Sequence, residues 1–362
     1  MRHRFIASFG VAAAIAFVAA LGPDARAQST QAPRPVPPKW TPPRTVDGRP
    51  DLAGNWSFAN ITPLERPTNL GEKATLTDAE AAQLEEQNAA RSKQDEGRQR
   101  GTAADVNRAY NDFWYDRGTR VASTKQTSLV VDPPNGRMPP LTADGQKRTD
   151  ETQARRRSRP SSWEDRSLYD RCLTRGPIGS ILPVIYGNGL EIHQTPNDVV
   201  IRYEMIHETR IIPLDAKPHV NEAIKMYMGD ARGRFEGDTL VVETKNMVGK
   251  TAIGLNGNGS PLSPSTTLVE RFKRVAGDQI DYSVTVTDPE TYTAPFTIAF
   301  PITPQPDYQV LPYECHEGNM ALANILSAAR AEDRAIAEAR AKGLPEPKFN
   351  NDDGPIFAPT RE

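Results

Sequence analysis

The stretch ECHEGN at residues 314–319 places a cysteine and a histidine between glutamates, a combination that could do chemistry. Cys315 could be a nucleophile, a metal ligand or half of a disulfide. The chain contains only one other cysteine, Cys172. The redox compartment decides between these roles, because free thiols persist in reducing compartments and disulfides in oxidising ones.

The N-terminal residues indicate the compartment. Two arginines precede an apolar run from Phe5 to Leu21, and the small residues around Ala27 follow it. This order is typical of a secretory signal peptide, with cleavage after Ala27. The run is too short and too rich in alanine for a membrane anchor, which needs about 20 apolar residues. We therefore expect a periplasmic or secreted protein without stable membrane insertion.

Export favours a disulfide between the two cysteines, since paired cysteines predominate in oxidising compartments. We predict the pair Cys172–Cys315. Closing a loop of this length contributes on the order of 4 kcal/mol in the chain-entropy model, less any strain in the native state. A catalytic thiolate would need a reduced state and a nearby base, so it is the weaker alternative.

The composition indicates a globular protein with long irregular parts. Hydrophobic residues make up 37% of the chain, prolines number 32 and the formal net charge is -2. The chain has no excess of basic residues that would indicate nucleic-acid binding. We interpret the arginine cluster RRRSRP at 155–160 as a solvated linker rather than a phosphate-tracking surface.

From Ile178 onward, apolar and polar residues alternate with a period of two, and the strands that this pattern predicts must position any site. Short turn signals at 196–198, 236–238 and 276–278 separate several of these segments, and short connections imply antiparallel strands. A meander of this length curls to protect its edges, which predicts a mainly β, lipocalin-like barrel. The predicted strands are LEIHQT, VVIRYEMIHETRIIPL, RGRFEGDTLVVETKNM, STTLVERFKRV, DQIDYSVTVTD and APFTIAFPI.

Other segments predict helices and linkers around the barrel. Residues 75–93 and 321–343 are rich in helix formers, and the second helix should dock on the barrel. Ser128–Asp132 resembles a strand, and 143–166 is interpreted as a surface helix or linker. The predicted organisation is a signal peptide (1–27), a proline-rich linker (28–46), an irregular or helical segment packing on the barrel (47–170), the barrel with its C-terminal helix (171–343) and a flexible tail (344–362).

Strand parity provides the first site hypothesis. If 199–214 is one strand, Tyr203 and His207 project from its apolar face into the barrel. Glu208 and Arg210 then belong to the opposite, charged face. A barrel interior with apolar walls and a few polar groups is suited to a small ligand. His207 could equally be a hydrogen-bonded core histidine.

His316 provides a second hypothesis, because a neighbouring disulfide would hold it in one orientation for acid–base catalysis. His316 and Glu317 could instead cap the helix that follows. No histidine pair has metal-ligand spacing, so we expect no metal, and no dinucleotide or P-loop motif indicates a cofactor. The predicted catalytic residues are Tyr203, His207, Glu208 and His316, and the predicted ligand-binding residues are Tyr186, His193, Arg210, Glu317 and Asn319.

Several motifs together resemble a family of secreted bacterial proteins that are mostly uncharacterised. They are DGRPDLAGNW, VVIRYEMIHETRIIPLD, MGDARGRFEGDTLVVETKNM, VERFKRV and ECHEGNMALANIL, across roughly residues 40 to 335. The resemblance implies an exported, lipocalin-like barrel and no agreed activity. It marks His207, Glu208, Arg210, Arg232, Asp238, His316, Glu317 and Asn319. This chain departs from the family at Phe235, where related sequences often have tryptophan, and in the insert IGLNGNGSPLSPS.

Three functions are consistent with these features. The first is an exported lyase, isomerase or hydrolase that transforms a small apolar or aromatic metabolite by acid–base chemistry of His, Tyr and Glu side chains. The second is a periplasmic carrier that binds such a ligand without chemistry. The third is an envelope scaffold. A barrel of this size commonly encloses one small ligand, which favours the first two.

Overall fold

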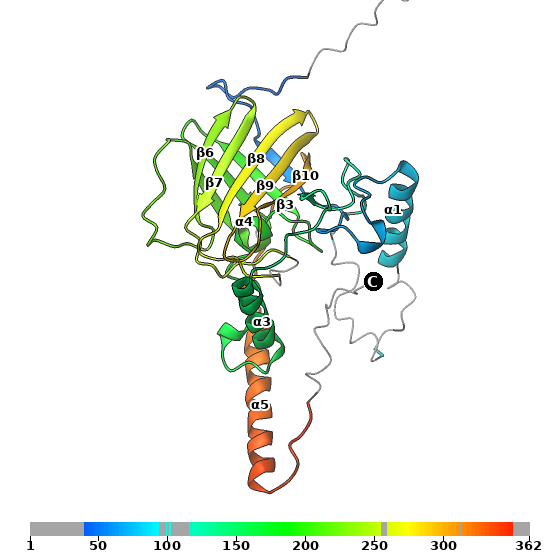
Figure 1. Cartoon of the computed structure of the whole chain (residues 1–362), viewed down its shortest axis with the longest axis vertical. Helices are drawn as coiled ribbons and strands as arrows, with labels where there is room; N and C mark the ends of the chain where they lie inside the picture. The colour runs from blue at the N-terminus through cyan, green and yellow to red at the C-terminus, as the bar shows by residue number, and fades with distance from the viewer. Residues whose placement is uncertain are drawn as a thin grey trace, which may run out of the picture. The chain divides into compact units, whose positions relative to one another are not determined.

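The computed structural model describes residues 40–93, 99, 101–102, 116, 118–254, 259–311 and 313–349 (Figure 1). Residues from Trp40 onward belong to one compact unit. The predicted signal peptide, linker residues 28–39 and tail residues 350–362 lie outside the described residues. No helix in the described ranges combines the length and the apolar character needed to cross a membrane.

The described residues form a ten-stranded sheet whose strand pairs are antiparallel. The strand order is β5-β4-β3-β1-β10-β9-β8-β7-β6, and β2 also pairs with β10. The sheet curls into a nearly closed barrel, as predicted (Figure 1). The strands are β1 (Gly54–Ser57), β2 (Val130–Asp132), β3 (Gly189–Gln194), β4 (Asp198–Tyr203), β5 (Thr209–Pro213), β6 (Asp230–Glu236), β7 (Thr239–Lys245), β8 (Thr267–Ala276), β9 (Gln279–Thr287) and β10 (Phe296–Pro304).

Side-chain packing brings the two end strands, β5 and β6, together. Gly233 of β6 lacks a Cβ atom, and one built there would lie 2.8 Å from Ile212 and 2.9 Å from Leu214. A larger residue would therefore push the two strands apart. The absence of a side chain at Gly233 lets the apolar end of β5 pack directly on β6.

The barrel interior follows the period-two pattern of the sequence. Along β8, Leu268, Glu270 and Phe272 point inward and are buried, while alternate residues are more exposed. The Tyr282 ring lies 4.9 Å from the Phe272 ring and 5.2 Å from the Phe300 ring, centroid to centroid. Such tilted aromatic pairs add to the burial of the rings, so this level of the barrel is filled with side chains.

Most of the predicted strands are confirmed, including the hairpin of β6 and β7 around Gly237. The predicted strand at Ser128–Asp132 is confirmed as β2. Strand β1 was not predicted, because a four-residue strand shows little alternation. It lies between β3 and β10, and its Trp56 is buried. The sheet therefore includes two strands from the chain before residue 171.

The helices lie outside the sheet, and α5 has only Ala329 and Ala339 buried along its length. Thr77 caps α1 through its side chain and the reciprocal contact of Glu80. Helix α5 contacts the segment after α3, where Arg159 Nε lies 3.1 Å from Asp333 Oδ1 and Arg330 donates to the carbonyl of Ser161. The helices are η1 (Thr68–Leu70), α1 (Asp78–Ser92), α3 (Ala143–Arg157), η3 (Trp163–Asp165), α4 (Gly176–Gly179), η4 (Met205–His207) and α5 (Ala321–Ala341).

The predicted disulfide between Cys172 and Cys315 is confirmed, with the two Cα atoms 5.6 Å apart. It links the segment before α4 to the approach of α5. Asn319 donates a 3.2 Å hydrogen bond to Cys172 Sγ and caps the N–H of Ala321. The start of α5 is therefore attached covalently to the barrel end at which α4 lies.

Candidate functional site

The prediction that 199–214 is one strand is wrong. Strand β4 ends at Tyr203 and β5 begins at Thr209, and the two pair as an antiparallel hairpin. The connection turns at Ile206 and His207, whose φ angles are 60° and 44°. Non-glycine residues seldom adopt this left-handed conformation, and the sequence EMIHET contains no glycine, proline or asparagine to signal a turn.

This hairpin reverses the predicted faces of His207 and Arg210. His207 lies in the turn and is exposed, with Nδ1 3.1 Å from the carbonyl of Tyr313. Tyr203 points into the barrel as predicted, but Arg210 does so too, because Arg210 and Ile201 are direct partners in the ladder. The structure therefore separates Tyr203 from His207, which the parity hypothesis had placed on one inward face.

Arg210 forms a buried ion pair with Glu270 across the barrel interior. Its two terminal nitrogens lie 3.0 and 2.7 Å from the carboxylate oxygens, and both side chains are at most 2% exposed. Thr244 accepts a further hydrogen bond from Arg210, and Tyr282 donates one to Glu270. Burial raises the pKa of Tyr203, which also contacts Arg210, to about 12. These groups are paired with one another inside the core.

The other predicted residues lie apart from this ion pair. His193 is exposed on β3 and contacts Glu191 at 3.1 Å. His316 and Glu317 are exposed in the turn before α5. Among the described residues, no group of three His, Cys, Asp or Glu side chains could hold a metal ion. The predicted roles of these residues in catalysis or ligand binding remain predictions.

Glu208 lies at the barrel end, in an environment that differs from that of an ordinary surface glutamate. The hydroxyl of Thr174 lies 2.8 Å from each of its carboxylate oxygens. Burial raises the pKa of Glu208, although hydrogen bonds from Thr174 and from the backbone of Arg175 lower it in part. A carboxyl group whose pKa is raised by burial is a candidate for proton transfer.

Arg175 was not predicted as a site residue, and its backbone donates a hydrogen bond to Glu208. The residue is 3% exposed, and its guanidinium lies 5.3 Å from the ring centroid of Tyr169. The Tyr169 hydroxyl is 3.0 Å from that of Tyr186, whose ring stacks on Tyr313 at 6.1 Å. The predicted ligand-binding residue Tyr186 thus belongs to an aromatic group next to a buried arginine.

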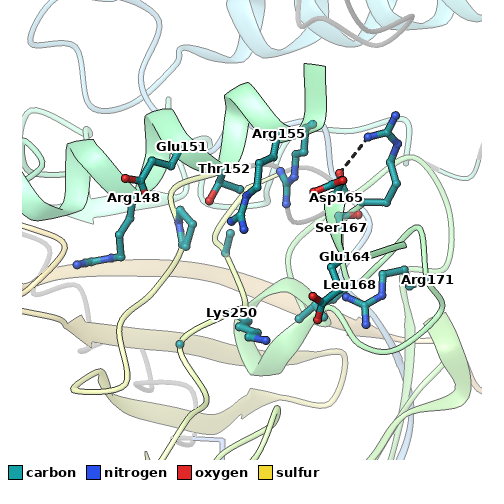
Figure 2. A pocket seen from close by; sticks show the side chains of 15 residues that line it. Arg148, Glu151, Thr152, Arg155, Glu164, Asp165, Ser167, Leu168, Arg171 and Lys250 are labelled. Atoms are coloured by element: carbon teal, nitrogen blue, oxygen red, sulfur yellow. Dashed lines mark hydrogen bonds between the residues drawn. The ribbon is translucent and has the colours of Figure 1, made fainter. Parts of the chain in front are cut away.

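A cavity of about 350 Å³ opens between α3, the segment 163–171 and the loop 249–261 (Figure 2). Figure 2 shows Arg148, Thr152 and Arg155 on α3 along one side and Lys250 on the opposite side. Two of the cavity's lining residues, Leu168 and Ala252, are chain neighbours of Tyr169 and Thr251, which contact Arg175 and Gly176. The lining residues are Arg148, Glu151, Thr152, Arg155, Arg156, Glu164, Asp165, Arg166, Ser167, Leu168, Arg171, Gly249, Lys250, Ala252 and Pro261.

The charge of this cavity is strongly positive. Six basic side chains against three acidic ones leave a formal excess of three positive charges. The α3 lining residues follow helical spacing: Arg148, 151–152 and 155–156 recur every three to four residues and so share one face. The interpretation of 155–160 as a linker is therefore wrong for its first three arginines, which belong to the end of α3, and two of them, Arg155 and Arg156, line the cavity.

The cavity walls are held in place by packing and hydrogen bonds. A Cβ atom on Gly145 of α3 would lie 2.3 Å from the carbonyl of Thr291, so the helix start fits closely against that segment. Arg148 Nη2 donates to the carbonyl of Glu290 and to the Thr291 hydroxyl, at 2.9 and 2.8 Å. Arg171 lies 4.3 Å from the ring centroid of Trp163, which positions its charge by a cation–π contact.

Comparison of the chain with protein-family models, with curated proteins and with solved structures found no match in any of the three. The assignment of function therefore depends on the geometry and charge of the site itself.

Proposed function

We propose that this protein is an exported barrel that binds a small polyvalent anion, such as a phosphate or polycarboxylate compound, in the basic cavity beside α3. The observation that carries the proposal is the charge of the lining, with six basic side chains around about 350 Å³. Cavities of this size accommodate small metabolites. Anions are bound most effectively where several arginines and lysines converge.

The cations in the cavity are available for a ligand. Among the described residues, Arg155, Arg171 and Lys250 form no ion pair within 4.0 Å. The carboxylate of Asp165 is occupied by hydrogen bonds from Ser161 and Ser162. A ligand anion would therefore meet positive charge that the protein itself does not neutralise.

The ligand class differs from the apolar or aromatic metabolite expected from the sequence. That expectation required Tyr203 and His207 to line an open barrel interior, but Tyr203 is hydrogen-bonded in a filled core and His207 is exposed. The cavity beside α3 has only Leu168, Ala252 and Pro261 as apolar lining residues. Its chemistry favours a charged, hydrophilic ligand.

Export to an oxidising compartment is part of this proposal, and three features support it. The Cys172–Cys315 disulfide is the bond expected in an oxidising compartment. The signal peptide that the sequence predicts in residues 1–27 would direct the export. The resemblance to secreted bacterial proteins agrees with periplasmic ligand binding.

A second candidate is acid–base catalysis by Glu208, because burial raises the pKa of its carboxyl group. In this hypothesis Glu208 acts without His207, because the imidazole of His207 contacts the Tyr313 carbonyl instead. A carboxyl group with a raised pKa keeps its proton to higher pH than an ordinary glutamate and can then donate it. A turnover screen with Glu208→Gln as the inactive comparison tests this candidate.

The binding proposal is tested by thermal denaturation of residues 28–362 with pyrophosphate, citrate and sulfate, beside neutral aromatic compounds. We expect the polyvalent anions to raise the Tm of the wild type in a saturable way. Arg155→Ala combined with Lys250→Ala should reduce that shift, since it removes two charges from opposite sides of the cavity.

Lys273→Ala, an exposed lysine on β8, is the matched control and should leave the anion response unchanged. Equal responses of the wild type and the double variant would refute the cavity as the binding site. A response to the neutral aromatic compounds alone would restore the apolar ligand class predicted from the sequence.

A further inference from the structure

The guanidinium of Arg175 has one edge that is buried and without a hydrogen-bond partner. Arg175 is 3% exposed, and its Nε and Nη2 atoms have no partner among the described residues. Within the described part of the chain it also forms no ion pair within 4.0 Å. A buried charge without a partner is unfavourable, so an anion bound at this edge would stabilise the fold.

The two unpartnered nitrogens define the class of anion. In a guanidinium group, Nε–H and the N–H of Nη2 point in the same direction and form one side of the planar fork. This side matches the two oxygens of a carboxylate, which it binds with two parallel hydrogen bonds. The unpartnered edge of Arg175 thus has the donor geometry that binds a carboxylate.

The surroundings of Arg175 favour a small planar group. Tyr169 lies over the guanidinium, with 5.3 Å between the Cζ atom and the ring centroid. The side chain of Thr251 lies against Gly176, where a Cβ atom would be 2.7 Å from it, and its buried hydroxyl has no hydrogen-bond partner in the described part of the chain. This hydroxyl is a further polar group, next to the residue that follows Arg175, that a ligand could satisfy.

The nearest acidic side chain does not fill this role. Glu208 accepts hydrogen bonds from the Thr174 hydroxyl and from the backbone of Arg175, rather than from the Arg175 side chain. Its carboxylate is therefore already committed to the 174–175 segment. An acid from outside the chain is left as the partner of the guanidinium edge.

We propose that the Nε–Nη2 edge of Arg175 binds the carboxylate of a small organic acid at the barrel end, as a site separate from the basic cavity. Tyr169, whose ring lies against the guanidinium, and Tyr186, whose hydroxyl lies 3.0 Å from that of Tyr169, are both half-buried beside it. The site depends on a single buried guanidinium, whereas the cavity depends on several exposed or half-buried cations. The two can therefore be tested independently.

The test is thermal denaturation in chloride buffer with increasing acetate or benzoate, with phosphate as the comparison anion. The wild type should show a saturable rise in Tm with the carboxylates, and Arg175→Met should lose it. Without carboxylate, Arg175→Met should melt at or above the wild-type temperature, because it removes an uncompensated buried charge. The control Arg155→Met should keep the carboxylate response, even if it weakens the response of the cavity to phosphate.

A wild type that does not respond to acetate or benzoate would overturn the proposal, and so would an unchanged response in Arg175→Met. If Arg175→Met does not fold, the Nε–H resonance of Arg175 in the ¹⁵N-labelled wild type provides the second measurement. Carboxylate binding predicts a saturable shift of that resonance with benzoate. A resonance that does not move would refute the site whatever the cavity binds.

Discussion

Removing one partner of the Arg210–Glu270 pair should destabilise the barrel more than removing both. Arg210→Met leaves the carboxylate of Glu270, which is fully buried, with a hydrogen bond from Tyr282 as its remaining contact. Breaking a buried ion pair in this way costs about 3 to 5 kcal/mol. Glu270→Leu leaves an equally uncompensated guanidinium, with a similar expected loss.

The double variant Arg210→Met/Glu270→Leu removes both charges and replaces them with apolar side chains. Such replacements are often neutral or stabilising by about 1 to 4 kcal/mol relative to the ion pair. The double variant should therefore be more stable than either single variant. Urea unfolding of the four proteins gives the coupling energy from the cycle.

An additive result, with the double variant losing the sum of the two single losses within about 0.5 kcal/mol, would refute this reasoning. It would mean that the two side chains contribute through packing rather than through their charges. Thr244→Val serves as the control, because it removes only a neutral hydrogen-bond partner of Arg210. A loss of about 1 kcal/mol is expected for that change.

Three further predictions concern the disulfide, Glu208 and α3. Replacing Cys172 and Cys315 by serine should lower the free energy of unfolding by about 2 to 5 kcal/mol relative to the disulfide-bonded wild type, as measured by urea unfolding, and the reduced wild type should show a similar loss. Because the folded state raises the pKa of Glu208 above 4.5, it holds the proton more tightly than the unfolded state, so stability should fall as pH rises between the two values. Glu208→Gln should abolish that fall, and a pH profile parallel to the wild type would contradict the burial argument. Gly145→Ala should lower the Tm, because the added methyl group would displace α3 from Thr291. An unchanged Tm would mean that α3 can move away from Thr291 without loss of stability.

The strands that the sequence predicted well are those with one buried and one solvated face. In β8 and β9 the inward residues alternate strictly, so periodicity alone identifies them. Strand β1 has only four residues and could not be identified in this way. Its place between β3 and β10 depends on long-range pairing that no local pattern encodes.

The side chains that face the barrel interior between β4 and β5 were harder to predict, because their positions depend on one turn. Ile206 and His207 adopt a left-handed conformation that tertiary packing imposes, and no residue in that stretch signals it. Once the turn is inserted, Arg210 becomes an inward residue and His207 a surface residue. A single missed reversal thus changed the predicted chemistry of the barrel.

One wall of the basic cavity could have been predicted from the sequence. The spacing of Arg148, Arg155 and Arg156 places them on one face of a helix, which helical periodicity could have indicated. The opposite wall, with Lys250, comes from a loop about a hundred residues further along the chain. Only the fold brings these two segments together, as it brings Arg175 beside Glu208.

The most direct test of anion binding is calorimetric titration of residues 28–362 with pyrophosphate at low and at physiological ionic strength. The account predicts saturable binding that weakens as salt screens the cavity charges, and that Arg155→Ala/Lys250→Ala weakens at least tenfold. Absence of binding at low ionic strength, or an affinity that neither salt nor the double variant changes, would contradict the assignment of an anion site to this cavity.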